Sequence, residues 1–131
     1  MKKELILILI MLSLITGCTN EESGGKIMYT NITAQEAKEI MDETENYVIL
    51  DVRTEEEYNE KHIPNAILIP DYEIEEKAEK VLKDKKQLIL VYCRSGRRSK
   101  IASEKLVSLG YENIKEFGGI IEWPYEMVSD K

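Results

Sequence analysis

The chain has 131 residues and a net charge of −7, with one histidine and two cysteines. This acidic balance disfavours nucleic acid as a partner, because binding to a phosphate backbone needs a basic face. One histidine and two cysteines are too few for a structural zinc site within one chain, and we expect neither a metal nor another cofactor.

Residues 1–17 have the pattern of a targeting signal. Lys2 and Lys3 give a short basic start, and residues 5–15 form an apolar run too short to span a bilayer as a stable anchor. The run ends in Ile-Thr-Gly-Cys at residues 15–18, which resembles a bacterial lipoprotein box with the lipid on Cys18. The resemblance predicts a lipoprotein signal peptide over residues 1–17 and a lipid anchor at the extracytoplasmic face of the cell membrane. An ordinary cleaved signal or a membrane-tethering helix is the alternative.

Residues 18–27 are rich in Asn, Glu, Ser and Gly, which is typical of a flexible linker. Residues 28–131 are enough for one domain with one core. If Cys18 carries a lipid, Cys93 is the only free thiol and no disulfide within the chain can form.

Helical and strand patterns alternate along this domain. Thr33 and Glu36 have the spacing of a capping box, which predicts a helix over residues 34–41. Residues 47–50 form a β-type apolar run that ends at Asp51.

The same capping-box spacing recurs at Thr54 and Glu57. From there we expect, in chain order, a short helix over residues 55–60, an extended segment over residues 66–69 and a charge-rich helix over residues 72–83.

The next elements surround the second cysteine. We expect a buried strand over residues 88–91, then Cys93, then a helix over residues 101–109 that ends at Gly110. A last strand over residues 114–117, a pair of glycines and a terminal helix around Trp123 complete the chain.

Strands that alternate with helices predict a mostly parallel sheet covered on both faces. Sites in such sheets lie at the carboxyl ends of the strands. Asp51 and Cys93 each stand at such an end, on strands that can be neighbours.

Cys93 has the surroundings of a nucleophile. The N–H groups of a short loop and of a helix start can converge on one point there and provide partial positive charge. Arg94, Arg97, Arg98 and Lys100 add full charges, with no acid among them. We therefore expect a stabilised thiolate that acts as a nucleophile.

Three separated motifs, in order, resemble the single-domain rhodanese family. The first covers residues 50–53, 57–58 and 62–66, the second covers residues 92–99, and the third covers residues 109–111, 117–119 and Trp123. The second motif is similar to the active-site loop of the catalytically competent members. Lys61 and Asn65 stand where the family usually has glycine in a turn.

This resemblance implies an α/β fold of the rhodanese type, a three-layer sandwich with a mostly parallel five-stranded sheet and helices on both faces. It also implies a sulfurtransferase whose partners are a small sulfur donor and an acceptor. The Cys93 thiolate takes a sulfane sulfur from a donor such as thiosulfate, forms a persulfide and passes the outer sulfur to cyanide or a thiol.

The loop after Cys93 is the expected substrate-binding segment, made of Arg94, Ser95, Gly96, Arg97, Arg98 and Ser99. Its N–H groups can cradle a persulfide anion, and Gly96 lets the backbone curl toward the sulfur. Arg97 or Arg98 can hold the oxygens of thiosulfate, since guanidinium suits such groups. The family pattern favours Arg98 for that role.

The sequence leaves two alternative functions. Phosphatases and arsenate reductases share this fold but need a longer loop, with an arginine six positions after the nucleophile. Ser99 holds that position here, and the arginines fall four and five positions after Cys93, so the loop is of the short type suited to sulfur. A binding or sulfur-sensing module without turnover is the second alternative, from a different class.

Several residues near the predicted site have a structural interpretation. Asp51 and Arg53 are expected to form a buried pair, and His62 to serve its turn rather than to act as a general base. Trp123 and Tyr125 are expected to pack in the core or over the pocket.

Overall fold

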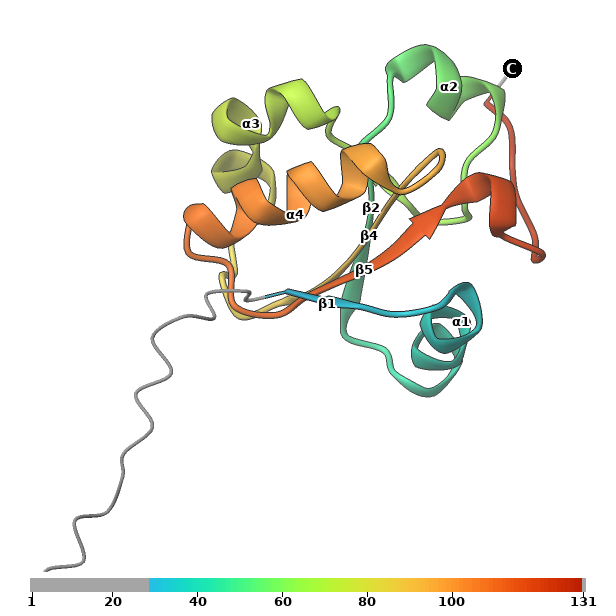
Figure 1. Cartoon of the computed structure of the whole chain (residues 1–131), viewed down its shortest axis with the longest axis horizontal. Coiled ribbons are helices and arrows are strands. Elements are labelled where there is room, and N and C mark those ends of the chain that lie inside the picture. Colours follow the sequence, from blue (N-terminus) through green and yellow to red (C-terminus); the bar gives the residue numbers. More distant parts are fainter. Residues whose placement is uncertain (1–28, 131) are drawn as a thin grey trace, which may run out of the picture.

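A parallel sheet of five strands forms the middle layer of the computed structural model, which describes residues 29–130 (Figure 1). The strands are β1 (Tyr29–Asn31), β2 (Tyr47–Asp51), β3 (Ile67–Leu68), β4 (Leu88–Cys93) and β5 (Ile114–Gly119). Their order across the sheet is β1-β5-β4-β2-β3, and each neighbouring pair is parallel. All strands therefore begin at one edge of the sheet and end at the other.

Helices cover both faces of this sheet, as the sequence predicts. The helices are α1 (Ala34–Glu43), α2 (Glu55–Glu60), α3 (Ile74–Val81) and α4 (Arg97–Ser108), with short 3₁₀ turns η1 (Asp71–Glu73) and η2 (Ile120–Glu122). Figure 1 shows α1 on one face, and α3 and α4 side by side on the other. The fold is the three-layer α/β sandwich implied by the resemblance.

Both predicted capping boxes are present. The Thr33 hydroxyl accepts from Glu36 N at 3.0 Å, and the Thr54 hydroxyl accepts from Glu57 N at 3.2 Å. In each case the glutamate accepts in return from the backbone N–H of the threonine. These reciprocal bonds satisfy donors that the first turn of a helix leaves free, and they fix where α1 and α2 begin.

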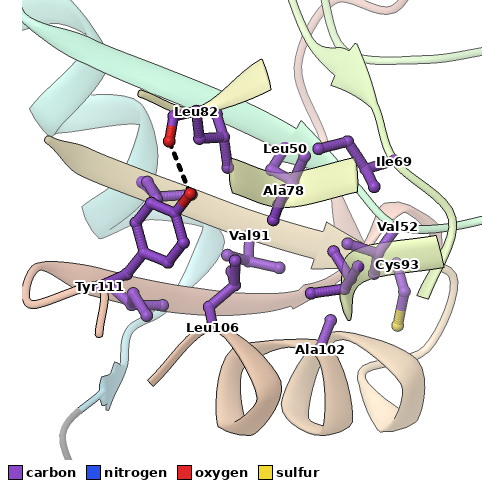
Figure 2. Packing of buried hydrophobic residues seen from close by; sticks show 13 residues of the cluster. Leu50, Val52, Ile69, Ala78, Leu82, Val91, Cys93, Ala102, Leu106 and Tyr111 are labelled. Atoms are coloured by element: carbon purple, nitrogen blue, oxygen red, sulfur yellow. Dashed lines mark hydrogen bonds between the residues drawn. The ribbon is translucent and has the colours of Figure 1, made fainter. Parts of the chain in front are cut away.

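Apolar side chains fill both spaces between the sheet and its helices. Neighbouring residues of β4 point to opposite faces, so Leu90 packs toward α1, whereas Val91 packs toward α3 and α4. On the side of α3 and α4, the Tyr111 hydroxyl donates to Leu82 O at 2.6 Å (Figure 2). Cys93 lies at one end of this cluster (Figure 2). The cysteine is thus held by the core itself.

One predicted helix begins at another residue, and one strand is absent from the prediction. Helix α4 starts at Arg97 rather than at residue 101, because its first turn has a polar surface and lacks the apolar periodicity used to predict it. Strand β1 was not predicted, since its three residues are polar or half-buried and pair only with β5. Short edge strands carry little pattern.

The C-terminal part also differs from prediction. Strand β5 continues through Gly118 and Gly119, where its register with β4 shifts between Val91 and Cys93. The predicted terminal helix around Trp123 is only the 3₁₀ turn η2, which ends one residue earlier. The chain then runs back to form an antiparallel bridge between Val128 and His62.

None of the helices in residues 29–130 is long and apolar enough to cross a membrane. The predicted signal peptide over residues 1–17, the linker over residues 18–27 and the lipidation site Cys18 lie outside the described residues.

Candidate active site

The carboxyl ends of β2 and β4 lie next to each other, as expected. Asp51 is paired with Tyr92 across these strands, so the predicted nucleophile Cys93 follows directly beside the end of β2. Open parallel sheets bind their ligands at this edge.

Cys93 ends β4 and begins a tight loop that leads into α4. Its side chain is 1% exposed, and the Gly96 N–H donates to Cys93 Sγ at 3.0 Å. Gly96 has a φ of 106°, a left-handed conformation that side chains resist, and it is the residue before the first turn of α4. A backbone donor and the amino end of a helix therefore meet at the sulfur.

The end of β5 supports this loop from behind. A Cβ atom on Gly119 would lie 1.8 Å from the carbonyl oxygen of Arg94 and 2.5 Å from Ser95 N, so only glycine fits there. Just after this contact, Ile121 N donates to Arg94 O at 3.3 Å. The shape of the loop thus depends on backbone contact with the second glycine of the pair noted in the sequence.

Ser99 lies between the sulfur and a buried carboxylate. Its Oγ is 3.3 Å from Cys93 Sγ and 2.6 Å from Glu116 Oε1. Glu116 is 1% exposed on β5, and it also accepts from Gly118 N at 2.9 Å and from the amide of Asn31 on β1. These donors compensate for the burial of the carboxylate.

Sequence reasoning missed Glu116, because a single acid in a short strand most often faces solvent. Side chains alternate between the two faces of a strand, and this alternation could have indicated that Glu116 is buried. Ile114 belongs to the apolar cluster under α4, and Glu116 is on the same face two residues later.

Arg98 is bound to Glu57 by two hydrogen bonds that join α4 to α2. Arg98 Nη1 donates to Glu57 Oε1 at 2.7 Å, and Nη2 donates to Oε2 at 3.0 Å. The Arg98 guanidinium, with help from the Thr54 backbone N–H, lowers the pKa of Glu57 to about 2. The prediction that Arg98 holds the oxygens of the sulfur donor stays a prediction, and in this structure Glu57 occupies its guanidinium.

Arg94 lies on an open cleft beside the loop. The cleft has a volume of about 490 Å³, and its lining includes Arg53, Glu57, Arg94, Ile121 and Trp123. Arg94, Ser95 and Arg97 are exposed, whereas Gly96 and Ser99 are buried. The predicted loop residues thus separate into a buried group at the sulfur and an exposed group around it.

Asp51 and Arg53 form the buried structural pair that the sequence predicts. Arg53 Nε and Nη2 donate to the Asp51 carboxylate at 2.9 and 2.7 Å, and Nη2 also donates to Lys61 O at 2.6 Å. The Tyr92 hydroxyl donates to Asp51 Oδ2 at 2.7 Å and accepts from Ile63 N at 3.1 Å. Burial, and then the negative charge of Asp51, raise the pKa of Tyr92. This network fixes the turn after β2.

His62 has the structural role predicted for it. Its Nδ1 is 2.8 Å from Tyr58 O, and its ring stacks on that of Tyr58 with centroids 3.8 Å apart. In the same turn, Asn65 replaces the usual glycine and takes up a left-handed φ of 70°, which Asn tolerates better than most residues.

Trp123 is buried in the apolar cluster on the α1 side, in agreement with the expected packing. Its ring lies 5.5 Å from that of Phe117 and 4.9 Å from that of Tyr125, measured between centroids. Within residues 29–130, no group of His, Cys, Asp or Glu side chains is arranged to hold a metal ion.

Comparison with known proteins agrees with this geometry. Thiosulfate sulfurtransferase PspE of Escherichia coli K12 is 38% identical over 71 residues, which are 54% of this chain and 68% of that protein. Thiosulfate sulfurtransferase GlpE of Coxiella burnetii is 35% identical over 98 residues, 74% of this chain and 89% of the relative. A solved structure, "rhodanese with anions from E. coli", superimposes with a TM-score of 0.60 at 34% identity, over 63% of this chain and 98% of that one. Since the family model for the rhodanese-like domain also matches residues 33–124, the chain belongs to the rhodanese-like family.

Proposed function

We propose that the protein is a sulfurtransferase that carries a sulfane sulfur on Cys93. In the first half-reaction the Cys93 thiolate attacks the outer sulfur of a donor such as thiosulfate, forms a persulfide and releases sulfite. In the second, cyanide or a thiolate attacks the outer sulfur of the persulfide, and the electron pair of the broken S–S bond returns to Cys93.

One observation carries the proposal: the sulfur of Cys93 receives the Gly96 N–H at 3.0 Å at the amino end of α4. This loop directs a backbone dipole toward the sulfur, where negative charge is present in the thiolate and in the persulfide. The two relatives named thiosulfate sulfurtransferase support the same chemistry.

The cleft beside the loop supports an anionic donor. Arg94 is an exposed residue of its lining, and guanidinium binds oxyanions with paired hydrogen bonds. Arg98 is the second candidate for these oxygens, and binding there requires it to release Glu57.

The test is intact-mass spectrometry of the full chain carrying Cys18→Ser, purified in detergent, so that Cys93 is the only thiol. Incubation with thiosulfate should add one sulfur atom, and cyanide or a small thiol should then remove it. The matched control is the same chain with Cys93→Ser, which should gain nothing. No sulfur gain on a reduced and accessible Cys93 would contradict transfer from thiosulfate and favour a binding or sensing role.

The location of the protein is a second part of this proposal. The Ile-Thr-Gly-Cys pattern at residues 15–18 supports a lipid on Cys18 and a place on the extracytoplasmic side of the cell membrane. Metabolic labelling with a tritiated fatty acid should mark the wild-type chain and not the Cys18→Ala variant. Equal labelling of both, or of neither, would contradict it.

A further inference from the structure

The contacts from Cys93 through Ser99 to Glu116 join the nucleophile to a carboxylate that the proposed reaction does not use. Ser99 is fully buried, and Glu116 is 1% exposed. Ser99 Oγ lies 3.3 Å from the sulfur and 2.6 Å from Glu116 Oε1. A buried charge that touches a neighbour of the nucleophile can control how that nucleophile ionises.

The hydroxyl of Ser99 has one proton and several acceptors around it. Besides Glu116 Oε1, the carbonyl oxygens of Gly96 and Gly118 lie 3.0 and 3.4 Å away. The Glu116 carboxylate is both the nearest acceptor and the charged one, so the Ser99 hydroxyl donates its hydrogen bond to Glu116. Ser99 then turns its lone pairs toward Cys93, whose thiol donates to Ser99 Oγ.

The Ser99 contact therefore favours the thiol form of Cys93, whereas the Gly96 N–H favours the thiolate. A thiolate in the same place would face the lone pairs of Ser99 Oγ until the Ser99 hydroxyl rotated from Glu116 to the sulfur. After that rotation, the Glu116 carboxylate still accepts hydrogen bonds from Gly118 N at 2.9 Å and from the amide of Asn31, so it remains hydrogen-bonded. The Ser99 hydroxyl can therefore donate a hydrogen bond in either of two orientations, to Glu116 or to the sulfur of Cys93.

We propose that Glu116 is a positioning residue that acts through Ser99: it holds the Ser99 hydroxyl proton and thereby sets the pH at which Cys93 releases its proton to solvent. The inference rests on the proposed function, in which the thiolate is the nucleophile. In the second half-reaction the electron pair of the S–S bond returns to Cys93, and the turned hydroxyl of Ser99 donates to it.

Other charged groups face the sulfur from the elements packed around it. Arg98 on α4 is one such group, and its pKa is raised first by the hydrogen bond with Glu57 and then by the charges of Glu57, Cys93 and Asp71. Arg98 is itself ion-paired with Glu57. On the neighbouring strand, the charge of Asp51 is compensated by Arg53.

Two further groups face Glu116. Tyr29 on β1 has its pKa raised by burial and then by the charges of Glu104 and Glu116. Lys100 on α4 extends toward the loop, where its Nζ would lie 3.7 Å from a Cβ placed on Gly96. Tyr29 and Lys100 are the same in wild type and in the Glu116→Gln variant, so their effects on Cys93 cancel when the two proteins are compared.

The test measures the alkylation rate of Cys93 by iodoacetamide across a pH series, in the full chain with Cys18→Ser. This rate follows the thiolate fraction, so its midpoint reports the ionisation of Cys93. Glu116→Gln keeps an acceptor oxygen but removes the charge, and we expect it to lower the midpoint by about one pH unit. Glu104→Gln removes the same charge from an exposed position on α4 and should leave the midpoint unchanged.

A second background tests whether the effect passes through Ser99. In a Ser99→Ala chain, Glu116→Gln should shift the midpoint by less than half as much, because the linking hydroxyl is gone. An unchanged midpoint in Glu116→Gln, a higher one, or equal shifts in both backgrounds would each overturn the proposal.

If Glu116→Gln does not fold, infrared spectroscopy replaces it. The S–H stretching band of Cys93, identified by its absence in Cys93→Ser, should move to the frequency of a free thiol in Ser99→Ala. A band that does not move overturns the proposal.

Neither measurement uses a sulfur donor. Sulfur loading from thiosulfate without the expected midpoint shift would remove the role of Glu116 and leave the proposed function standing. The expected midpoint shift without sulfur loading would support the role of Glu116 and contradict the proposed function.

Discussion

Arg98 and Glu57 tie the first turn of α4 to α2 through a two-pronged ion pair, with distances of 2.7 and 3.0 Å between Nη1 and Oε1 and between Nη2 and Oε2. Glu57 also accepts from the Thr54 N–H at 3.1 Å as part of a capping box. A single carboxylate thus joins the start of α2 to the helix that follows the cysteine loop.

This pair predicts a defined loss of stability in acid. The pKa of Glu57 is lowered from 4.5 to about 2, so its ionised form stabilises the fold above about pH 4.5, and that contribution is lost as the pH falls toward 2. Glu57→Gln keeps the capping box and removes the charge, and it should cost about 2 kcal/mol at neutral pH after allowance for its partial exposure.

Urea unfolding at a series of pH values measures this effect. The difference between wild type and Glu57→Gln should shrink across that acid window. Glu56→Gln changes an exposed residue of the same helix and should follow wild type throughout. A constant difference down to pH 2 would show that the charge of Glu57 is not its source.

Gly119→Ala should disrupt the cysteine loop. The added Cβ would lie 1.8 Å from Arg94 O, so backbone must move, and we expect a loss of about 3 kcal/mol in unfolding free energy together with loss of sulfur loading. Gly110→Ala is the control. Its φ of 96° is left-handed, unlike that of Gly119, but its nearest neighbour is the flexible end of Lys85, so it should cost about 1 kcal/mol and keep loading. Equal effects would contradict the steric explanation.

Removing Arg53 should leave a buried charge without its partner. Asp51 is fully buried, and we expect Arg53→Met to lower the unfolding free energy by about 3 kcal/mol. Adding Asp51→Asn should recover part of that loss, because no unpaired charge then remains. Lys77→Met, which breaks a surface pair with Glu73, should leave the unfolding free energy nearly unchanged. No recovery in the double variant would point to lost packing instead.

Arg94→Gln should weaken the binding of thiosulfate. Arg94 lines the cleft beside the loop, and the loss of a charged donor should raise KM about ten-fold with little change in kcat. Arg97→Gln makes the same change at an exposed position at the start of α4 and should raise KM by about two-fold or less. The reverse order, measured by steady-state kinetics with cyanide, would place the donor nearer Arg97.

The sequence predicts best those parts of the fold that have a strong local pattern. The apolar run before Cys93, the two capping boxes and the stop at Gly110 are all present in the structure. Because parallel strands end at one edge, the sequence placed Asp51 and Cys93 at the same rim of the sheet, and the pairing of β2 with β4 makes them neighbours.

The parts that were missed depend on contacts between distant segments. Strand β1 exists through its pairing with β5, and Glu116 is buried because Asn31, Ser99 and Gly118 donate to it. The ion pair of Arg98 joins residues 41 positions apart. The residue pattern within a short stretch of sequence does not indicate partners that are distant along the chain.

The polarity of the sheet gives the domain two distinct ends. Tyr29 enters beside Ile114, where β5 begins, whereas Cys93 stands where β4 ends, at the opposite rim. Any tether that acts on the chain before Tyr29 is therefore attached at the rim of the sheet where β1 and β5 begin. The cleft that Arg94 lines lies at the opposite rim, away from any such tether.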